Sequence, residues 1–203
     1  MPSVSDPDLS DAQLVEAARR GDVAAFNELV VAHQVTAYNV ALRTLGNPDD
    51  AADATQDAFV SAFRAMKDFR GGSFKAWLAR IVVNACYDVL RRRQRRPATS
   101  LELVLEGGET DPGFADREIG PERAALSAET AGQVQRALLS LPEEQRALVV
   151  LCDIQGFSYE EAAEATDAAL GTVKSRLSRA RTKLRELLTE QGELPAALER
   201  RYE

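Results

Sequence analysis

Residues 158–185 carry the pattern that most restricts the fold of this chain, because two short amphipathic segments are separated there by a tight turn. Ser158 is followed three residues later by Glu161, which is the spacing of a helix-starting capping box. Gly171 relaxes the turn, and Thr172 is placed to cap the second helix. Apolar residues recur along that second helix at spacings of four and three: Val173, Leu177, Ala180, Leu184 and Leu187. Such a stripe after a capped helix and a short turn predicts a helix-turn-helix unit.

The second predicted helix is strongly basic. Between Ala168 and Arg185 the sequence contains no aspartate or glutamate. At about 100° per residue, its serines point away from the apolar stripe and most of its cations flank the stripe. A recognition helix reads bases mainly with its N-terminal residues, while neighbouring cations hold phosphates. We therefore predict DNA contacts by Thr172, Lys174, Ser175, Ser178, Arg179 and Arg181. For the helix taken alone, the alternative is a solvated cationic surface.

The composition limits the classes of function. The 203 residues carry a net charge of −7, which argues against a purely electrostatic nucleic-acid binder, although basic residues gather at 91–96 and 174–185. Cys86 and Cys152 lack CxxC spacing and the sole histidine, His33, lies in a helical pattern, so we expect no metal site and no cofactor. The N-terminus lacks a signal-peptide pattern, and no apolar run approaches a membrane span. We expect a cytoplasmic protein without membrane insertion.

Helical signals run through most of the chain. Before Pro97, helix starts are predicted by a capping box at Ser10, by Asn47 followed by Pro48, and by a cap at Ser73. Helix ends are predicted by C-caps at Gly21 and Gly46. From 98 to 120 glycine, proline, threonine and acids replace the helical period, which predicts a flexible acidic linker. Helical signals resume at Pro121, and 191–203 is predicted to be a tail. The sequence thus predicts an all-α chain with helical domains at 10–97 and 121–190.

The helix predicted after Pro48 has an acidic face. Asp49, Asp53 and Asp57 recur every four residues, with Gln56 adjacent. Like charges at this spacing cost stability unless a partner neutralises them, so the face is either a docking surface or a solvated one. On the same helix, we expect the two aromatic side chains to lie in the domain core: Phe59 and Phe63.

The next predicted helix carries a polar face opposite its apolar stripe. Trp77 belongs by its spacing to the stripe, where we expect it to be buried. The opposite side carries Arg80, Asn84, Asp88 and Arg91. An outward amide beside arginines suits hydrogen bonding to base edges. The arginine block that follows suits binding to phosphate, or else it is a solvated helix end.

These segments resemble a known family. The stretch DAADATQDAFVSAFRAMKDFRGGSFKAWLARIVVNACYDVLRRR resembles region 2 of bacterial sigma factors, and LPEEQRALVVLCDIQGFSYEEAAEATDAALGTVKSRLSRARTKLRELL resembles region 4. A region 2 followed by a region 4, without the intervening region 3 domain, is the plan of the extracytoplasmic-function (ECF) group. The resemblance implies a sigma-E-like factor that binds core RNA polymerase, recognises promoters and opens DNA, and that is not itself an enzyme.

The resemblance also assigns partners and residues. It implies docking on the β′ clamp helices of core polymerase through Asp53, Gln56 and Asp57, and a further contact of the polymerase β flap. The helix with Asn84 and the loop before it would read the −10 element, with DNA contacts by Arg80, Asn84, Arg91 and Arg92. The helix-turn-helix would read the −35 element. An anti-sigma factor is implied as a further partner.

Two alternatives to a sigma factor are a helix-turn-helix repressor or activator and an enzyme. An ordinary helix-turn-helix repressor or activator could share the C-terminal unit, but it would need residues 1–97 to serve as a ligand-binding or dimerisation domain. The acidic face at 49–57 and the Asn84 helix fit promoter melting better. An enzyme is disfavoured because the sequence shows no phosphate-binding glycine loop, nucleophile and base pair, or metal-ligand cluster. We expect the free chain to be compact and to bind promoter duplex poorly until polymerase separates its domains.

Overall fold

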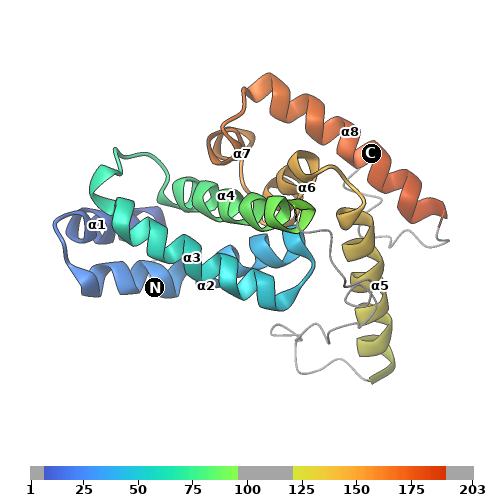
Figure 1. The fold of residues 1–203 in the computed structure, drawn as a ribbon, viewed down its shortest axis with the longest axis horizontal. Helices are drawn as coiled ribbons and strands as arrows, with labels where there is room; N and C mark the ends of the chain where they lie inside the picture. The colour runs from blue at the N-terminus through green and yellow to red at the C-terminus, as the bar shows by residue number, and fades with distance from the viewer. Residues whose placement is uncertain (1–6, 96–120, 191–203) are drawn as a thin grey trace, which may run out of the picture.

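The computed structural model describes residues 7–95 and 121–190. Every regular element within these ranges is helical, which confirms the all-α prediction. Figure 1 shows these helices in two groups, one before and one after the gap in the description. The predicted linker at 98–120 and the predicted tail at 191–203 lie outside the described residues.

The first domain contains α1 (Pro7–Arg19), α2 (Val23–Leu45), α3 (Pro48–Ala65), the 3₁₀ turn η1 (Met66–Asp68) and α4 (Phe74–Arg95). The helix α2 packs against α1, α3 and α4, and α3 also packs against α4 (Figure 1). The helix α1 begins at Pro7, three residues before the capping box predicted at Ser10, so that prediction of the helix start was wrong.

Other predicted helix ends are confirmed by their hydrogen bonds. The Asn47 side chain accepts from the Asp50 N–H (2.9 Å), with Pro48 at the first helical position. Gly46 closes α2 in the left-handed region, with φ at +73°, and its N–H donates to the Leu42 carbonyl. The Ser73 hydroxyl oxygen accepts from the Ala76 N–H (3.2 Å) at the start of α4. Local chemistry therefore fixes the end of α2 and the starts of α3 and α4.

The core side of α3 is made of small residues. Ala51, Ala54, Ala58 and Ala62 are buried, and their small side chains let α3 lie close to α2 and α4. Phe59 packs partly buried against the core, as predicted. Phe63 does not, because its side chain is 49% exposed even though its ring contacts Phe26 edge-on, with 5.1 Å between centroids. The prediction that Phe63 is a core residue was therefore wrong.

The second domain contains α5 (Pro121–Leu139), α6 (Glu143–Val149), the π-helical turn η2 (Val150–Ile154), α7 (Tyr159–Thr166) and α8 (Leu170–Glu190). In η2 the Gln155 N–H donates to the Val150 carbonyl five residues earlier (2.9 Å). The Ser158 and Glu161 capping box predicted for α7 is present, with both reciprocal hydrogen bonds.

The turn between α7 and α8 lies earlier than predicted. Asp167 ends α7 with a φ of +51°, and the Val173 N–H already donates to the Ala169 carbonyl, so α8 begins at Leu170. Gly171 and Thr172 are therefore inside the helix. The prediction that Thr172 caps α8 was wrong, because aspartate, which tolerates the left-handed region, makes the turn in place of glycine.

The two domains pack against each other. Leu139 of α5 lies over Gly46, so close that a β-carbon there would stand 2.6 Å from a Leu139 methyl carbon. On the other side of the contact, the Ser73 hydroxyl donates to Glu161 Oε1 (3.1 Å), and Lys75 Nζ lies 4.1 Å from the centroid of the buried Phe157 ring. The domains thus share one hydrophobic core in this arrangement.

Arg146 is the most buried cation of this contact. Its guanidinium donates to the carbonyls of Leu138, Leu139 and Leu141 in its own domain, and to the carbonyl of Thr44 at the end of α2 (2.7 Å). These carbonyls include the last ones of α5 and α2, which have no partner within their helices. Burial lowers the pKa of Arg146. One side chain thus satisfies the ends of two helices from different domains.

Candidate nucleic-acid interface

The outward face of α8 carries four of the predicted contact residues. Lys174, Ser175, Ser178 and Arg179 are exposed, and Thr172 is half-buried at the start of the helix. The apolar stripe is buried opposite them, with Val173, Leu177 and Ala180 at most 1% exposed. The Ser175 hydroxyl donates to the Thr172 carbonyl (3.0 Å), as serine commonly does within helices. The face can offer two cations and two hydroxyls to a groove.

Arg181 does not belong to that outward face. Its Nη2 lies 2.6 Å from Asp153 Oδ1, and its Nε lies 3.1 Å from Asp153 Oδ2. The Tyr159 hydroxyl accepts from a third nitrogen at 3.2 Å. The hydrogen bonds to Asp153 raise the pKa of Arg181 further above its already high value. The guanidinium therefore spans η2, α7 and α8 within its own domain.

Two acidic residues next to α8 were missed by sequence reasoning. Asp153 binds Arg181 as described, and Glu144 of α6 forms an ion pair with Arg176 (2.5 Å). Neither lies in the helix-turn-helix motif as read from sequence, because Glu144 in α6 and Asp153 in η2 both precede α7. The only signal for Asp153 was an acid on an otherwise apolar segment, and that signal does not identify a partner.

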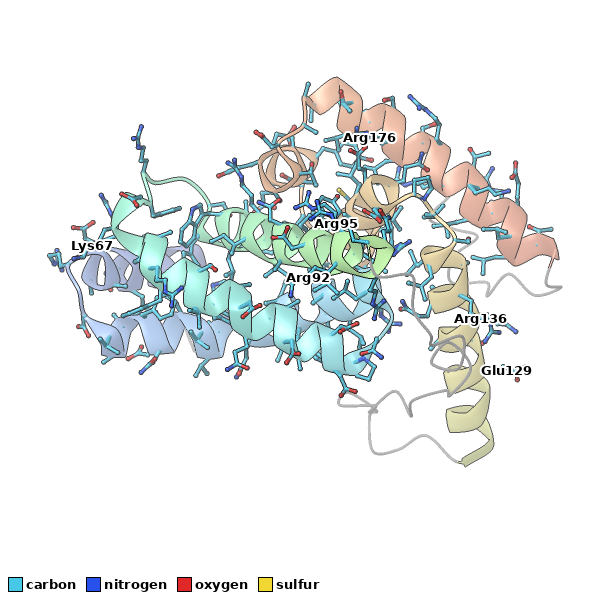
Figure 2. All side chains as sticks on the ribbon, viewed as in Figure 1. Lys67, Arg92, Arg95, Glu129, Arg136 and Arg176 are labelled. Carbon is cyan, nitrogen blue, oxygen red and sulfur yellow. The ribbon has the colours of Figure 1, made fainter. Side chains whose placement is uncertain are left out.

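The predicted −10 face lies on α4. Asn84, Arg91 and Arg92 are exposed, and Asn84 makes no side-chain hydrogen bond within the part of the chain that the structure describes. Arg91 pairs with Asp88, and Arg92 Nε donates to the Asp88 carbonyl (3.3 Å). Figure 2 labels Arg92 towards the C-terminal end of this helix. The structure therefore brings an outward amide and two arginines onto one helix, within two turns.

Arg80 lies at the margin of this face and near the second domain. Its Nη2 is 4.0 Å from the Asp167 carboxylate, in the turn between α7 and α8. Both side chains are largely exposed, at 47% and 85%, so the pair contributes little to stability. Among the predicted −10 residues, Arg80 is therefore linked to the second domain by an ion pair.

The acidic face of α3 is exposed as predicted. Asp49, Asp53, Gln56 and Asp57 point away from the alanine side of the helix. Among residues 11–95 and 129–189, no cation pairs with Asp53 or Asp57. Asp50 differs, because it pairs with Arg93 of α4. Within the two turns beyond Asp57, the face continues with two exposed apolar residues, Val60 (43%) and Phe63 (49%).

The described residues contain no candidate metal centre and no candidate membrane span. No group of three or more His, Cys, Asp or Glu side chains in the described residues could hold a metal ion. No described helix is long and apolar enough to cross a membrane. Burial raises the pKa of Cys86 to about 12 and that of Cys152 to about 11, so both are protonated thiols at neutral pH.

Comparison with known proteins matches both domains to one family. The family model described as Sigma-70 region 2 matches residues 29–96, and the model described as Sigma-70, region 4 matches residues 131–184. The ECF RNA polymerase sigma factor SigM of Mycobacterium tuberculosis is 44% identical over 180 residues, covering 88% of this chain and 85% of SigM. The ECF RNA polymerase sigma-E factor of Escherichia coli K12 is 41% identical over 175 residues, covering 85% of this chain and 91% of the sigma-E factor.

A solved structure agrees with these sequence matches. It is the sigma factor RpoE of Bartonella quintana in complex with the anti-sigma factor NepR, which is 31% identical with a TM-score of 0.65 and covers 82% of this chain and 98% of that one. Region 2 and region 4 matches in this order, with relatives above 40% identity across most of both chains, leave one conclusion. The chain belongs to the ECF RNA polymerase sigma factors.

Proposed function

We propose that this sigma factor binds core polymerase through α3 and contacts promoter DNA with the outward faces of α4 and α8. The observation that carries the proposal is the segregation of outward-facing polar groups: acids on α3, an amide and arginines on α4, and cations with hydroxyls on α8. In this role the chain acts as an initiation factor in the cytoplasm, and we assign it no catalytic activity of its own.

Docking on polymerase is assigned to Asp53, Gln56 and Asp57. Two carboxylates one helical turn apart repel each other, and a cation relieves that repulsion. With the amide between them, they therefore suit binding to a basic surface. Family membership supports the β′ clamp helices as that surface. The same membership supports a contact of the second domain with the β flap.

Reading of the −10 element is assigned to Arg80, Asn84, Arg91 and Arg92. Asn84 has both an amide donor and a carbonyl acceptor available, which is the pair that a base edge requires. Arg91 and Arg92, about two turns further along the helix, provide phosphate contacts. We expect Asn84→Ala to reduce promoter opening about tenfold, the size of one lost base contact, whereas Gln34→Ala on the exposed face of α2 leaves it unchanged. Equal activity of both variants would contradict this assignment.

Reading of the −35 element is assigned to Thr172, Lys174, Ser175, Ser178 and Arg179. The N-terminal turns of α8 carry these residues on one side, which is the part of a recognition helix that enters the major groove. Arg181 was predicted to belong to this set. Because Asp153 and Tyr159 occupy its guanidinium, we propose a different role for it below.

The packed arrangement of the two domains cannot serve both elements at once. Elements named −35 and −10 lie about 25 base pairs apart, which is about 85 Å of duplex at 3.4 Å per base pair. A compact chain of this length has a radius of gyration of only about 17 Å. The contacts of Leu139 with Gly46 and of Arg146 with Thr44 must therefore break before both elements are bound. This supports the expectation that the free chain binds promoter duplex poorly and that polymerase holds the domains apart.

An anti-sigma factor is proposed as a second partner, by similarity to RpoE of Bartonella quintana, which was crystallised with the anti-sigma factor NepR. Affinity purification of the full chain from its host should recover a second protein besides the polymerase subunits. Recovery of polymerase subunits alone would contradict this part of the proposal.

The function as a whole is tested by run-off transcription with core polymerase on a library of genomic fragments. A sigma factor directs initiation at a defined set of fragments, and alignment of the start sites gives the promoter. If the chain instead binds duplex DNA tightly without polymerase and yields no transcript, the repressor or activator alternative replaces this proposal.

A further inference from the structure

Two arginines bracket the apolar stripe of α8. Arg176 pairs with Glu144 of α6 (2.5 Å), and Arg181 pairs with Asp153 of η2 (2.6 Å). Figure 2 labels Arg176 on the side of α8 that faces the rest of the domain. Both guanidinium groups are mostly buried, at 28% and 29% side-chain exposure, in contrast to the exposed cations of the outward face.

The positions of these arginines around the helix axis are informative. Five residues apart, they differ by about 140° of rotation at about 100° per residue. Leu177 and Ala180 lie between them on the buried side, so the two ion pairs stand on opposite flanks of the stripe. The buried apolar stripe limits α8 to rotations that keep the stripe covered, but apolar contacts have no preferred direction and do not by themselves fix the exact angle. Two directional anchors on opposite flanks oppose rotation of α8 in either sense.

The two anchors differ in strength. Asp153 is 11% exposed and receives two nitrogens of Arg181, a bidentate arrangement that combines charge with fixed geometry. The Tyr159 hydroxyl adds a contact from α7, the other helix of the motif. Glu144 is 61% exposed and makes a single ion pair, which water and salt weaken. The Asp153 pair is therefore the stronger anchor and the one that links all three elements.

We propose that the Arg181–Asp153 and Arg176–Glu144 pairs set the rotation of α8 about its axis, so that these four residues position the −35-reading face and do not themselves bind DNA. The inference rests on the proposed function of α8. It removes Arg181 from the DNA-contact set and adds Asp153 and Glu144 as positioning residues on elements outside the helix-turn-helix.

The test compares holoenzymes that carry full-length variants. Transcription is measured on a promoter recovered from the fragment library and on the same promoter with its −35 element scrambled, and the ratio gives the −35 dependence. We expect Asp153→Asn and Arg181→Gln each to lower this ratio about five- to tenfold, and the double variant to lower it no further. Arg181→Lys should lose nearly as much, because lysine keeps the charge but not the bidentate geometry.

The salt dependence of open-complex formation provides a second readout. A phosphate contact contributes about one to the slope of log K against log salt concentration, and a positioning residue does not. We therefore expect unchanged slopes for Asp153→Asn and Arg181→Gln. Activity retained by Asp153→Asn and by Arg181→Lys, together with a reduced slope for Arg181→Gln, would overturn the inference.

Control variants separate this inference from the proposed function. Lys174→Ala and Arg179→Ala should lower the ratio and reduce the slope. If these controls have no effect, the assignment of α8 itself fails; if they act as expected and Asp153→Asn does not, only the positioning role fails. Should Asp153→Asn fail to fold by circular dichroism, Glu144→Gln removes the exposed anchor alone, and a two- to threefold loss of the ratio is expected. No loss in Glu144→Gln would then overturn the inference.

Discussion

The helices α3 and α8 are both charged, but they use charge in opposite ways. On α3, Asp53 and Asp57 are exposed and have no partner among residues 11–95 and 129–189. On α8, Arg176 and Arg181 are held by acids of their own domain. A charge already paired within the fold is held in place by its partner, and a charge left unpaired remains available for another molecule. The sign and density of charge in the sequence do not distinguish the two cases.

Arg146 provides the largest test of what a paired cation contributes. Its replacement by methionine leaves buried carbonyls of α5 and α2 without a donor, each costing about 1–3 kcal/mol. We expect Arg146→Met to lower the free energy of unfolding by about 3–5 kcal/mol in urea denaturation. The matched control is Arg136→Met on the exposed side of α5, which should change it by less than about 0.5 kcal/mol. A small effect at Arg146 would show that the pairing seen in the fold is not energetically important.

Asp57 tests the opposite case, an unpaired charge. Asp57→Lys reverses the charge on the proposed docking face without removing any described contact. We expect its affinity for core polymerase to fall by a factor of ten or more, with the free energy of unfolding unchanged or slightly higher. Glu28→Lys, an exposed reversal on α2, controls for net charge. Equal affinities of the two variants in a competition assay would remove α3 from the interface.

Each domain also buries one neutral titratable group, a cysteine thiol. Cys86 lies in α4 of the first domain, and Cys152 lies in η2 of the second. Burial raises their pKa values to about 12 and about 11, from about 9.0 in the unfolded chain. The unfolded state therefore loses these protons first, and stability falls as the pH rises from 9 towards 11, by at most about 1.4 kcal/mol per pH unit for each group. Denaturation at pH 8 and pH 10 measures the fall.

The paired controls for this prediction are Cys86→Ala and Cys152→Ala. The fall in stability between pH 8 and pH 10 should be reduced by nearly the same amount in each variant, because both thiols keep their protons in the folded state up to pH 10. An unchanged fall in both variants would assign it to other groups. Tyr87 is one such group, since burial raises its pKa to about 12 as well.

The smallest predicted effect compares two neighbouring aspartates of α3. Asp53→Asn removes a like-charge repulsion and should raise the free energy of unfolding by about 0.2–0.5 kcal/mol. Asp50→Asn removes the ion pair with Arg93 and should lower it by a similar amount. Thermal unfolding of the two variants in parallel gives the difference. The same sign for both would mean that local pairing does not control the response.

Much of the fold follows from local chemistry that a sequence displays. The caps at Asn47, Gly46 and Ser158 lie where their residue types require them. The turn before α8 was misplaced because a glycine was assigned to it, whereas Asp167 adopts the left-handed conformation. Phe63 was misplaced because helical spacing does not show that alanines already fill the core side of α3.

The residues of the candidate sites also divide into those that the sequence could place and those that it could not. The exposure of Asn84, Asp57 and Lys174 follows from helical periodicity, which places them opposite buried stripes. The ion pair of Arg181 could not be predicted from periodicity, because its partner Asp153 is 28 residues away in η2, on a different element from Arg181 in α8. Arg146 was missed for the same reason, since its fourth acceptor, Thr44, is 102 residues away. Long-range pairing is the information that a pattern in one segment lacks.

The π turn at Val150–Ile154 makes the second domain sensitive to chain length at one point. A π turn contains one more residue than the α-helical turn it replaces, so each residue after it is displaced by about 100° relative to a continuous α-helix. Asp153 sits inside this turn, two residues before Gln155 closes it by donating to Val150. Deleting a single residue here would restore an uninterrupted helix while turning the carboxylate away from Arg181. A family member one residue shorter at this turn would then have to anchor its recognition helix by other means.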